Sequence, residues 1–423
     1  MTEQRTDPGV HQPGKLWTRD FTIITVGSVV SMFGNALSGF AISLLVLDFT
    51  KSTFLYALFI MAYTLPQLIM PILSGAVLDR YSRKKTIYSL DFISSALFAF
   101  AALIFHFRLF SYPMLLLFSL LIGTVNSVYL VAYESFYPLL ITEGNFSKAY
   151  SVSSVLETLS SVMIPISALI YNRIGIAPLF AVNALSFFTA AVMETQIRTN
   201  EEYIEKRDTD SLKMNKSRII LSDIREGMQY LYSEKGLLAI AVYFAFSSMT
   251  GGASSTITLP YFKSTFLNGE YVYMLVWGMM IVGRTIGGML HYRIRIPTEY
   301  KYAIALTVYL LLSVLEGTYL FFPIPIMMLF CLISGLGGVT SYTIRISATQ
   351  SYVPDEKKGR FNGVFNMINT AGSLLGELVA GILCLILSPR IVLISCMLIN
   401  GIAAAVLIGG NHTHVAAIYN RQQ

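Results

Sequence analysis

The feature that most constrains this chain is a series of apolar segments, each near 20 residues long, along its 423 residues. A helix of about 20 apolar residues is long enough to cross the hydrocarbon core of a bilayer. Only 13% of the residues are charged and 54% are hydrophobic, which excludes a soluble globular protein. The sequence therefore predicts an all-α, polytopic membrane protein.

We expect twelve membrane spans, six in each half of the chain. They are 21–47, 53–78, 86–107, 112–136, 146–171, 177–195, 237–259, 271–292, 302–321, 323–346, 361–387 and 391–409. The expected domains are a tail (1–20), a six-helix bundle (21–195), a linker (196–236), a second bundle (237–409) and a tail (410–423). The linker is polar at first and then amphipathic from Arg218 to Tyr232, which predicts a helix lying on the membrane surface.

The positive charges predict the orientation of the chain. With both termini in the cytoplasm, 23 of the 30 Lys and Arg residues lie on the cytoplasmic side, five lie outside and two lie within spans. This bias follows the positive-inside rule. Because the cations cluster in loops between apolar segments, the net charge of +6 does not indicate nucleic-acid binding.

The sequence predicts no enzyme, metal site or cofactor. There is no phosphate-binding glycine loop with a lysine, so ATP is not the expected energy source. The histidines are dispersed apart from His412 and His414, and the three cysteines have no metal-ligand spacing. A disulfide is not expected either.

The loop from Gly75 to Lys85 joins two apolar segments and is dense in charge. An acid and four cations fall within seven positions there, which places the loop outside the hydrocarbon. Gly75 allows two helices to approach closely, and Asp79 can face a helix N-terminus. Arg80 and Arg83 can reach acids on neighbouring helices. The alternative is an ordinary positive-inside loop.

This loop resembles the signature of the major facilitator superfamily of transporters, in Gly75, Leu78, Asp79, Arg80, Arg83 and Lys84. Ser82 stands where the family has a glycine. The resemblance implies two pseudo-symmetric six-helix bundles, with a solute path between them that opens by alternating access.

An internal repeat favours the same architecture. A constant shift of 212 residues places Gly75–Asp79 on Gly287–His291, and also places Pro113 on Pro325, Gly123 on Gly335 and Lys148 on Arg360. His291 stands where the first copy has Asp79, so the second loop has diverged.

Shorter stretches resemble the bacterial branch of macrolide-efflux and enterobactin-exporter-type drug:proton antiporters. These stretches are Asp79–Lys85, Ile224–Met228 with Leu231, and Lys235–Leu237. Two positions depart from standard proton antiporters. Leu120 stands where many carry an arginine, and the glycine-rich signature of the fifth helix is reduced to Ser161–Pro165.

Charged residues inside the expected spans are candidates for function, because hydrocarbon disfavours charge. Glu157 lies ~16 Å along the fifth span and is the leading proton-coupling candidate. Arg284 in the eighth span lies at a similar depth. Either the two form an ion pair, or both face the central cavity separately, or they act in local helix packing.

The other charged candidates lie nearer the ends of spans. Glu134 can pair with Arg83 and latch the inner gate, or it can simply reach the membrane interface, and Arg345 lies at a similar level. Glu377 is a second proton-coupling candidate, and Glu316 is a weaker one.

The resemblance also implies which spans line the cavity. The expected neutral polar lining comprises Asn35, Asn126, Tyr129, Tyr133, Ser247, Ser248, Thr250, Tyr342, Asn366 and Asn369. A cavity with aromatic and aliphatic walls and few polar groups suits bulky amphipathic ligands. Alternatively, these aromatic side chains pack against lipid or against one another.

These observations predict a monomeric secondary transporter in the bacterial inner membrane, with both termini cytoplasmic. The expected function is proton-coupled efflux of hydrophobic or amphipathic small molecules, with lipid, protons and the solute as partners. The alternatives are a carrier of another cargo (a siderophore, a lipid-like molecule or a nutrient) and a non-transporting sensor derived from a carrier.

Overall fold

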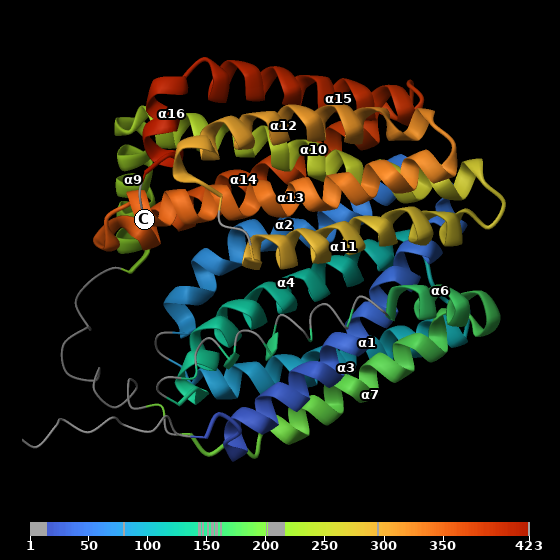
Figure 1. Ribbon diagram of the computed structural model, residues 1–423. Helices are drawn as coiled ribbons and strands as arrows, with labels where there is room; N and C mark the ends of the chain where they lie inside the picture. Colours follow the sequence, from blue (N-terminus) through green and yellow to red (C-terminus); the bar gives the residue numbers. More distant parts are fainter. Residues whose placement is uncertain are drawn as a thin grey trace, which may run out of the picture. The chain divides into compact units, whose positions relative to one another are not determined.

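The computed structural model describes residues 15–78, 81–142, 145, 148–149, 152–153, 156, 160, 163–199, 201, 216–293 and 296–421. Every regular element in this part of the chain is a helix (Figure 1). Ten of the described helices are long and apolar enough to cross a membrane. The predicted fold class, an all-α polytopic membrane protein, is therefore confirmed.

The described residues of the first half form six α-helices and one short 3-10 helix. They are α1 (Arg19–Thr50), α2 (Thr53–Leu78), α3 (Arg83–His106), α4 (Tyr112–Phe136), the 3-10 helix η1 (Tyr137–Leu140), α6 (Met163–Ile174) and α7 (Ile176–Glu194). The structure describes the expected fifth span, 146–171, only in part, and the described end of this span belongs to α6.

The second half begins with α9 (Lys216–Ser233), at the place where an amphipathic helix is expected. The elements that follow are α10 (Lys235–Thr265), α11 (Gly269–Arg293), η2 (Thr298–Tyr300), α12 (Lys301–Thr318), η3 (Tyr319–Phe321), α13 (Ile324–Tyr352), α14 (Asp355–Leu383), α15 (Pro389–Ala403), the π-helical turn η4 (Ala404–Gly409) and α16 (His412–Tyr419). The helix α16 lies in the expected C-terminal tail, and its Tyr419 is fully buried.

The helix α14 is not among the ten apolar helices, although it has 29 residues and covers most of the expected eleventh span, 361–387. Its first turns are charged, and Asn366, Asn369 and Glu377 follow along its length. These residues lower its mean hydropathy, so α14 combines the length of a membrane span with polar groups.

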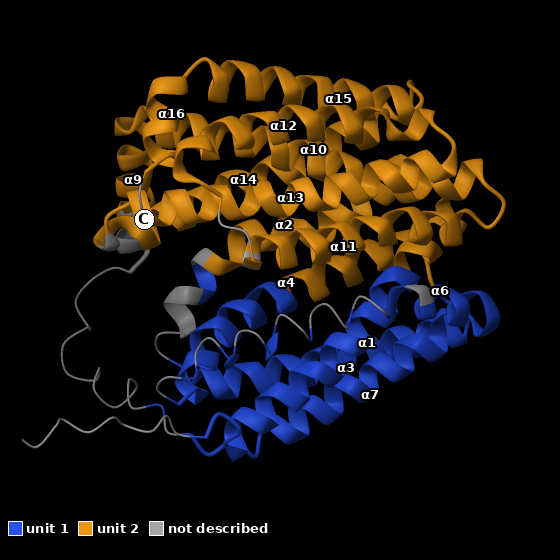
Figure 2. Cartoon of the chain, viewed as in Figure 1, with its two compact units in different colours: residues 1–41, 73–109, 125–210 blue, residues 42–72, 110–124, 211–423 orange. Residues whose placement is uncertain are grey.

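The chain divides into two compact units, shown in different colours in Figure 2. The first unit comprises residues 1–41, 73–109 and 125–210, and the second comprises 42–72, 110–124 and 211–423. The units do not coincide with the two expected bundles, because α1, α2 and α4 each contribute to both. In the second unit, for example, Ala57 of α2 packs against Gly381 of α14.

In the first unit, α3 packs along α7. Phe98 of α3 stacks on Phe187 at a centroid distance of 5.7 Å and meets Phe180 edge-on at 5.6 Å. The Ser95 hydroxyl donates to the carbonyl oxygen of Ala184 at 2.8 Å. Stacked rings and a buried side-chain hydrogen bond fix the register of the two helices.

In the second unit, small residues bring helix backbones together. Gly372 and Gly376 form a GxxxG pair on α14, and Gly283 and Gly287 form another on α11. A Cβ atom added at Gly376 would lie 1.8 Å from the carbonyl oxygen of Met249 on α10. Such small-xxx-small pairs are typical of tightly packed membrane helices.

Candidate functional site

The described part of the charged loop is held at the start of α3. Ser82 is the N-cap residue, and its hydroxyl oxygen accepts from the backbone N–H of Lys85 at 3.1 Å. The carboxylate of Glu201 accepts from the N–H groups of Arg83 at 2.8 Å and Lys84 at 3.4 Å, and from the Ser82 hydroxyl. An anion at a helix N-terminus satisfies free N–H groups and complements the helix dipole.

The segment that follows α7 also forms hydrogen bonds with the start of α1. Asp20 Oδ2 accepts from the backbone N–H groups of Arg198 at 3.0 Å and Thr199 at 2.7 Å. The Lys84 ammonium donates to the carbonyl oxygen of Ile197 at 3.1 Å. The described residues between α7 and Glu201 therefore contact the N-terminal ends of two helices, in a stretch where the sequence predicts only a linker.

Of the expected gate residues, Gly75 lies in the last turn of α2, while Asp79 and Arg80 lie outside the described residues. The Arg83 guanidinium donates through Nη1 to the carbonyl oxygen of Ser135 at 2.9 Å. Ser135 follows Glu134, whose side chain is exposed. The structure thus brings Arg83 to the backbone beside Glu134, at the end of α4.

Glu377 is the described proton-coupling candidate, whereas Glu157 lies outside the described residues. The side chain of Glu377 is only 3% exposed. Oε1 accepts from the hydroxyl of Ser373 at 3.3 Å and from that of Thr64 on α2 at 3.5 Å. Oε2 is buried and has no hydrogen-bond partner among the described residues. A buried carboxyl group with a free oxygen can take up a proton.

Arg284 lies on an exposed part of α11, and its charge interacts with that of Glu316 on α12. Glu316 borders a cavity of about 10 Å³, which has room for about one water molecule. Ser254, Trp277 and Ser334 also line this cavity. The expected partner Glu157 is not described, so the Glu157–Arg284 ion pair stays a prediction.

Arg345 lies among aromatic rings within the second unit. Its guanidinium carbon is 4.8 Å from the ring centroid of Phe365, 5.0 Å from that of Phe244 and 5.4 Å from that of Tyr342. These rings come from α14, α10 and α13. The faces of the rings offset part of the cost of burying a cation.

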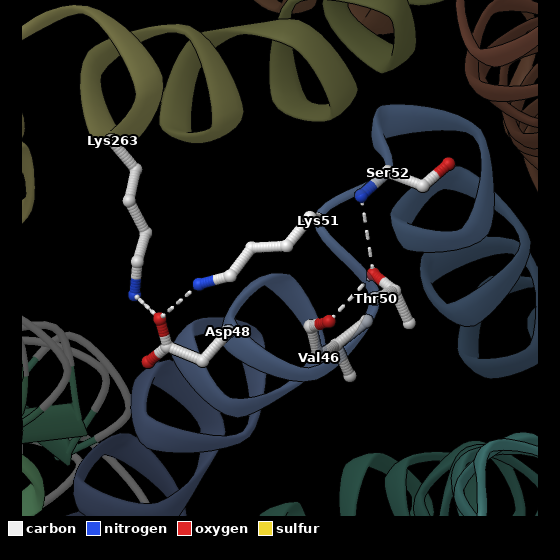
Figure 3. A network of polar contacts seen from close by, with 6 residues as sticks. All are labelled: Val46, Asp48, Thr50, Lys51, Ser52 and Lys263. Atoms are coloured by element: carbon white, nitrogen blue, oxygen red, sulfur yellow. Dashed lines mark hydrogen bonds and ion pairs between the residues drawn. The ribbon is translucent and has the colours of Figure 1, made fainter.

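Asp48, at the end of α1, forms an ion pair with Lys263 on α10 (Figure 3). The Lys263 ammonium lies 2.8 Å from Asp48 Oδ1, and that of Lys51 lies 3.4 Å from the same oxygen. The Asp48–Lys263 pair therefore joins a helix of the first half to a helix of the second half within one compact unit.

The expected cavity residues differ in exposure, and one of them, Thr250, is buried. Asn35, Asn366 and Tyr342 are exposed, whereas Asn126, Tyr129, Ser247 and Asn369 are half-buried. In the first unit, the Asn183 amide donates to Asn35 Oδ1 at 3.4 Å. In the second unit, Asn369 Oδ1 is buried without a hydrogen-bond partner among the described residues.

Two acids that the sequence reasoning missed lie inside the first unit. Asp91 on α3 and Glu194 at the end of α7 are almost fully buried, and their carboxyl groups interact electrostatically. The sequence does contain a signal for them, namely an acidic residue inside an expected span: Asp91 lies in 86–107 and Glu194 in 177–195. Charge inside a span was the criterion that selected Glu157.

Membrane-length helices with buried carboxyl groups between them are typical of membrane transporters. The chain belongs to the Major Facilitator Superfamily, whose sequence profile matches residues 24–377. The predicted family is thus confirmed.

Several bacterial proteins are similar in sequence. Macrolide efflux protein A of Streptococcus pyogenes is 24% identical over 376 residues, which cover 85% of this chain and 87% of that protein. Uncharacterized MFS-type transporter YfiS of Bacillus subtilis is 25% identical over 339 residues, covering 77% of each chain. Uncharacterized MFS-type transporter YkuC of the same organism is 24% identical over 239 residues, and this match spans only about half of either chain, at 55%.

Solved structures with similar folds include two transporters. The nucleoside transporter NupG superposes with a TM-score of 0.66 at 13% identity, covering 93% of this chain and 98% of that one. The peptide transporter POT superposes with a TM-score of 0.67 at 12% identity, covering 97% of both. At these identities the similarity shows a shared fold.

Proposed function

We propose that this protein exports a hydrophobic or amphipathic small molecule from the bacterial cytoplasm, driven by the proton gradient and working by alternating access. The similarity to Macrolide efflux protein A along 85% of the chain supports efflux as the direction and an amphipathic molecule as the cargo. The inner membrane is the proposed location, with both termini cytoplasmic and the protein acting as a monomer.

The observation on which the proton coupling rests is Glu377. Its carboxyl group is buried, one oxygen has no partner among the described residues, and the other accepts from Thr64 on α2 and Ser373 on α14. A proton on this carboxyl can therefore alter the link between a helix of the first half and a helix of the second half. Glu157 is a further candidate for the same role.

The charged loop is the proposed gate at the cytoplasmic end of the transport path. Asp79, Arg80 and Arg83, with Glu134, would close this end when the helices come together. The Arg83 contact with the end of α4 supports this role. The cavity residues Asn35, Asn126, Tyr129, Ser247, Tyr342, Asn366 and Asn369 would offer a few hydrogen bonds to a mainly apolar cargo.

Transport by purified protein in liposomes tests this proposal. A radiolabelled macrolide and an amphipathic fluorescent dye serve as probes, with and without an imposed pH difference. We expect the wild-type protein to move at least one probe against its gradient when the pH difference is present. In Glu377→Gln, the amide keeps the shape of the side chain but does not titrate, so transport driven by the pH difference should fall to the level of empty liposomes.

The matched control is Glu299→Gln, which changes an exposed carboxylate of η2. This variant should transport like the wild type. If Glu377→Gln still uses the pH difference, the assignment of Glu377 is wrong. If the wild type moves neither probe at any pH difference, the proposed cargo class is wrong.

A further inference from the structure

Arg345 of α13 is a cation that forms no ion pair with any residue the structure describes. Its guanidinium carbon instead lies 4.8 Å from the ring centroid of Phe365, 5.0 Å from that of Phe244 and 5.4 Å from that of Tyr342. Its Nε atom is buried and has no hydrogen-bond partner in the described part of the chain. The guanidinium therefore has N–H donors on all three nitrogens and no described acceptor for them.

The three rings form an aromatic cage (Phe244, Tyr342 and Phe365) that is held by the packed core of the second unit. Phe244 of α10 and Phe365 of α14 meet at a centroid distance of 5.9 Å, and Tyr309 of α12 meets Phe244 edge-on at 5.7 Å. The hydroxyl groups of Tyr309 and Tyr419 share a hydrogen bond at 2.9 Å. Contacts from four helices thus fix the place of the guanidinium.

The position of Arg345 makes an unpaired charge costly. It lies ~10 Å before the end of α13 at Tyr352, within a helix of membrane length. An arginine does not lose its proton in proteins, so it cannot escape this cost by becoming neutral. The ring faces offset part of the cost, but they supply neither a counter-charge nor a hydrogen-bond acceptor in the ring plane. An intramembrane cation of this kind is typical of a ligand site.

The aromatic cage is open on one side. Tyr342 is 55% exposed, and Arg345 is half-buried. Nε is the guanidinium nitrogen that is buried without a partner, so the two terminal nitrogens, which also make no described hydrogen bond, stay accessible. Their N–H groups form a planar fork that matches the two oxygens of a carboxylate or phosphate group.

We propose that Arg345 and the aromatic cage bind the carboxylate or phosphate group of an amphipathic molecule, whose apolar body lies against the exposed ring of Tyr342. The anion supplies the counter-charge and the acceptors that the described residues do not. The guanidinium repels a cation, so the site selects ligands by the sign of their charge. That the bound anion is the exported cargo rests on the proposed function, whereas the binding itself does not.

The first test is calorimetric titration of the purified full-length protein in a neutral detergent. Three probes share one aromatic body: naphthylacetate is an anion, naphthylethanol is neutral and naphthylethylammonium is a cation. After subtraction of binding to empty micelles, naphthylacetate should bind about tenfold more tightly than the alcohol, or better, because a hydrogen bond to a charged group is gained. Equal affinities for the anion and the alcohol, or a preference for the ammonium probe, would overturn the proposal.

Arg345→Met keeps the length of the side chain and removes its charge. It should weaken naphthylacetate binding about ten- to hundredfold, and leave the affinity for naphthylethanol unchanged. Arg345→Lys should restore part of the affinity for the anion, since it keeps the charge without the planar fork, and it serves if Arg345→Met does not fold.

The matched control is Arg293→Gln, which removes an exposed cation at the end of α11 and should bind like the wild type. Wild-type affinity for naphthylacetate in Arg345→Met would mean that Arg345 only holds the three rings together, and would overturn the proposal.

Lipid nanodiscs test the source of the anion. A higher unfolding temperature with phosphatidylglycerol than with phosphatidylcholine alone, lost in Arg345→Met and kept in Arg293→Gln, would identify a lipid phosphate. Naphthylacetate binding without this lipid effect would identify a soluble molecule. A response to neither anion would overturn the proposal. None of these measurements involves transport, so a failure of binding here and a failure of export in liposomes are separate results.

Discussion

At the scale of single residues, glycines decide how closely the helices of the second unit approach one another. The Cβ position of Gly376 falls 1.8 Å from the Met249 carbonyl oxygen, and that of Gly252 falls 2.2 Å from the Ser373 carbonyl oxygen. The neighbouring atoms belong to backbone, so they cannot rotate away as a flexible side chain would. The close contact between α10 and α14 thus requires glycine, which has no side chain, at these two positions.

Replacing Gly376 by Ala should therefore force α10 and α14 apart. We expect a loss of stability of about 1–3 kcal/mol, the usual cost of overpacking a tight interior. The measurement is thermal unfolding of the purified protein. Gly251→Ala is the matched control on α10, because a Cβ atom there meets nothing within 4 Å. Equal stability of the two variants would contradict the close backbone contact.

At the scale of elements, the start of α3 depends on a residue that is distant in sequence. Glu201, 7% exposed, accepts from the backbone N–H groups of Arg83 and Lys84 and from the hydroxyl of the N-cap residue Ser82. These groups have no partner within the helix, because the first turn lies before the first intrahelical acceptors. The end of the charged loop is thus ordered partly by Glu201, a residue that does not belong to the loop.

Glu201→Ala should loosen the first turn of α3. The expected cost is about 0.5–2 kcal/mol, the range for loss of a helix cap. Amide hydrogen exchange of residues 83–86 should accelerate, while exchange in the middle of α3 stays slow. Glu226→Ala serves as the control, since Glu226 is exposed and pairs only with Arg360, at 2.8 Å, in the described contacts. Unchanged exchange in Glu201→Ala would show that the cap does not order the turn.

At the scale of the whole molecule, two contacts in the second unit join helices from different halves of the chain. They are the Asp48–Lys263 ion pair and the Thr64–Glu377 hydrogen bond. A transporter that works by alternating access must break such contacts at one stage of its cycle and form them again at another. The structure therefore describes a state in which the end of α1 is joined to α10.

Locking that contact should stop transport. We expect a short cross-linker between cysteines in Asp48→Cys/Lys263→Cys to reduce transport of the liposome probes to background, and cleavage of the linker to restore it. The native Cys331, Cys384 and Cys396 are first replaced by serine or alanine.

The two single-cysteine variants, treated in the same way, are the controls and should stay active. Full transport by the cross-linked double variant would mean that α1 and α10 do not separate during the cycle.

The family and the membrane fold were predictable from the sequence because they depend on local features. The length of an apolar run decides whether a helix can cross a bilayer, and the loop from Gly75 to Lys85 shows its charges in consecutive residues. Among the candidate residues, Glu377 was found because it is a carboxyl group inside an expected span, 361–387.

Only the tertiary structure decided which polar groups meet. Asp91 and Glu194 are 103 positions apart, and Glu201 caps a helix that begins 118 positions earlier, at Arg83. Such partners depend on the register and rotation of packed helices, which ring stacking and backbone contacts at glycines set together. Hydrophobicity along the chain fixes the depth of each residue in the membrane, but it carries no information about which neighbouring helix that residue faces.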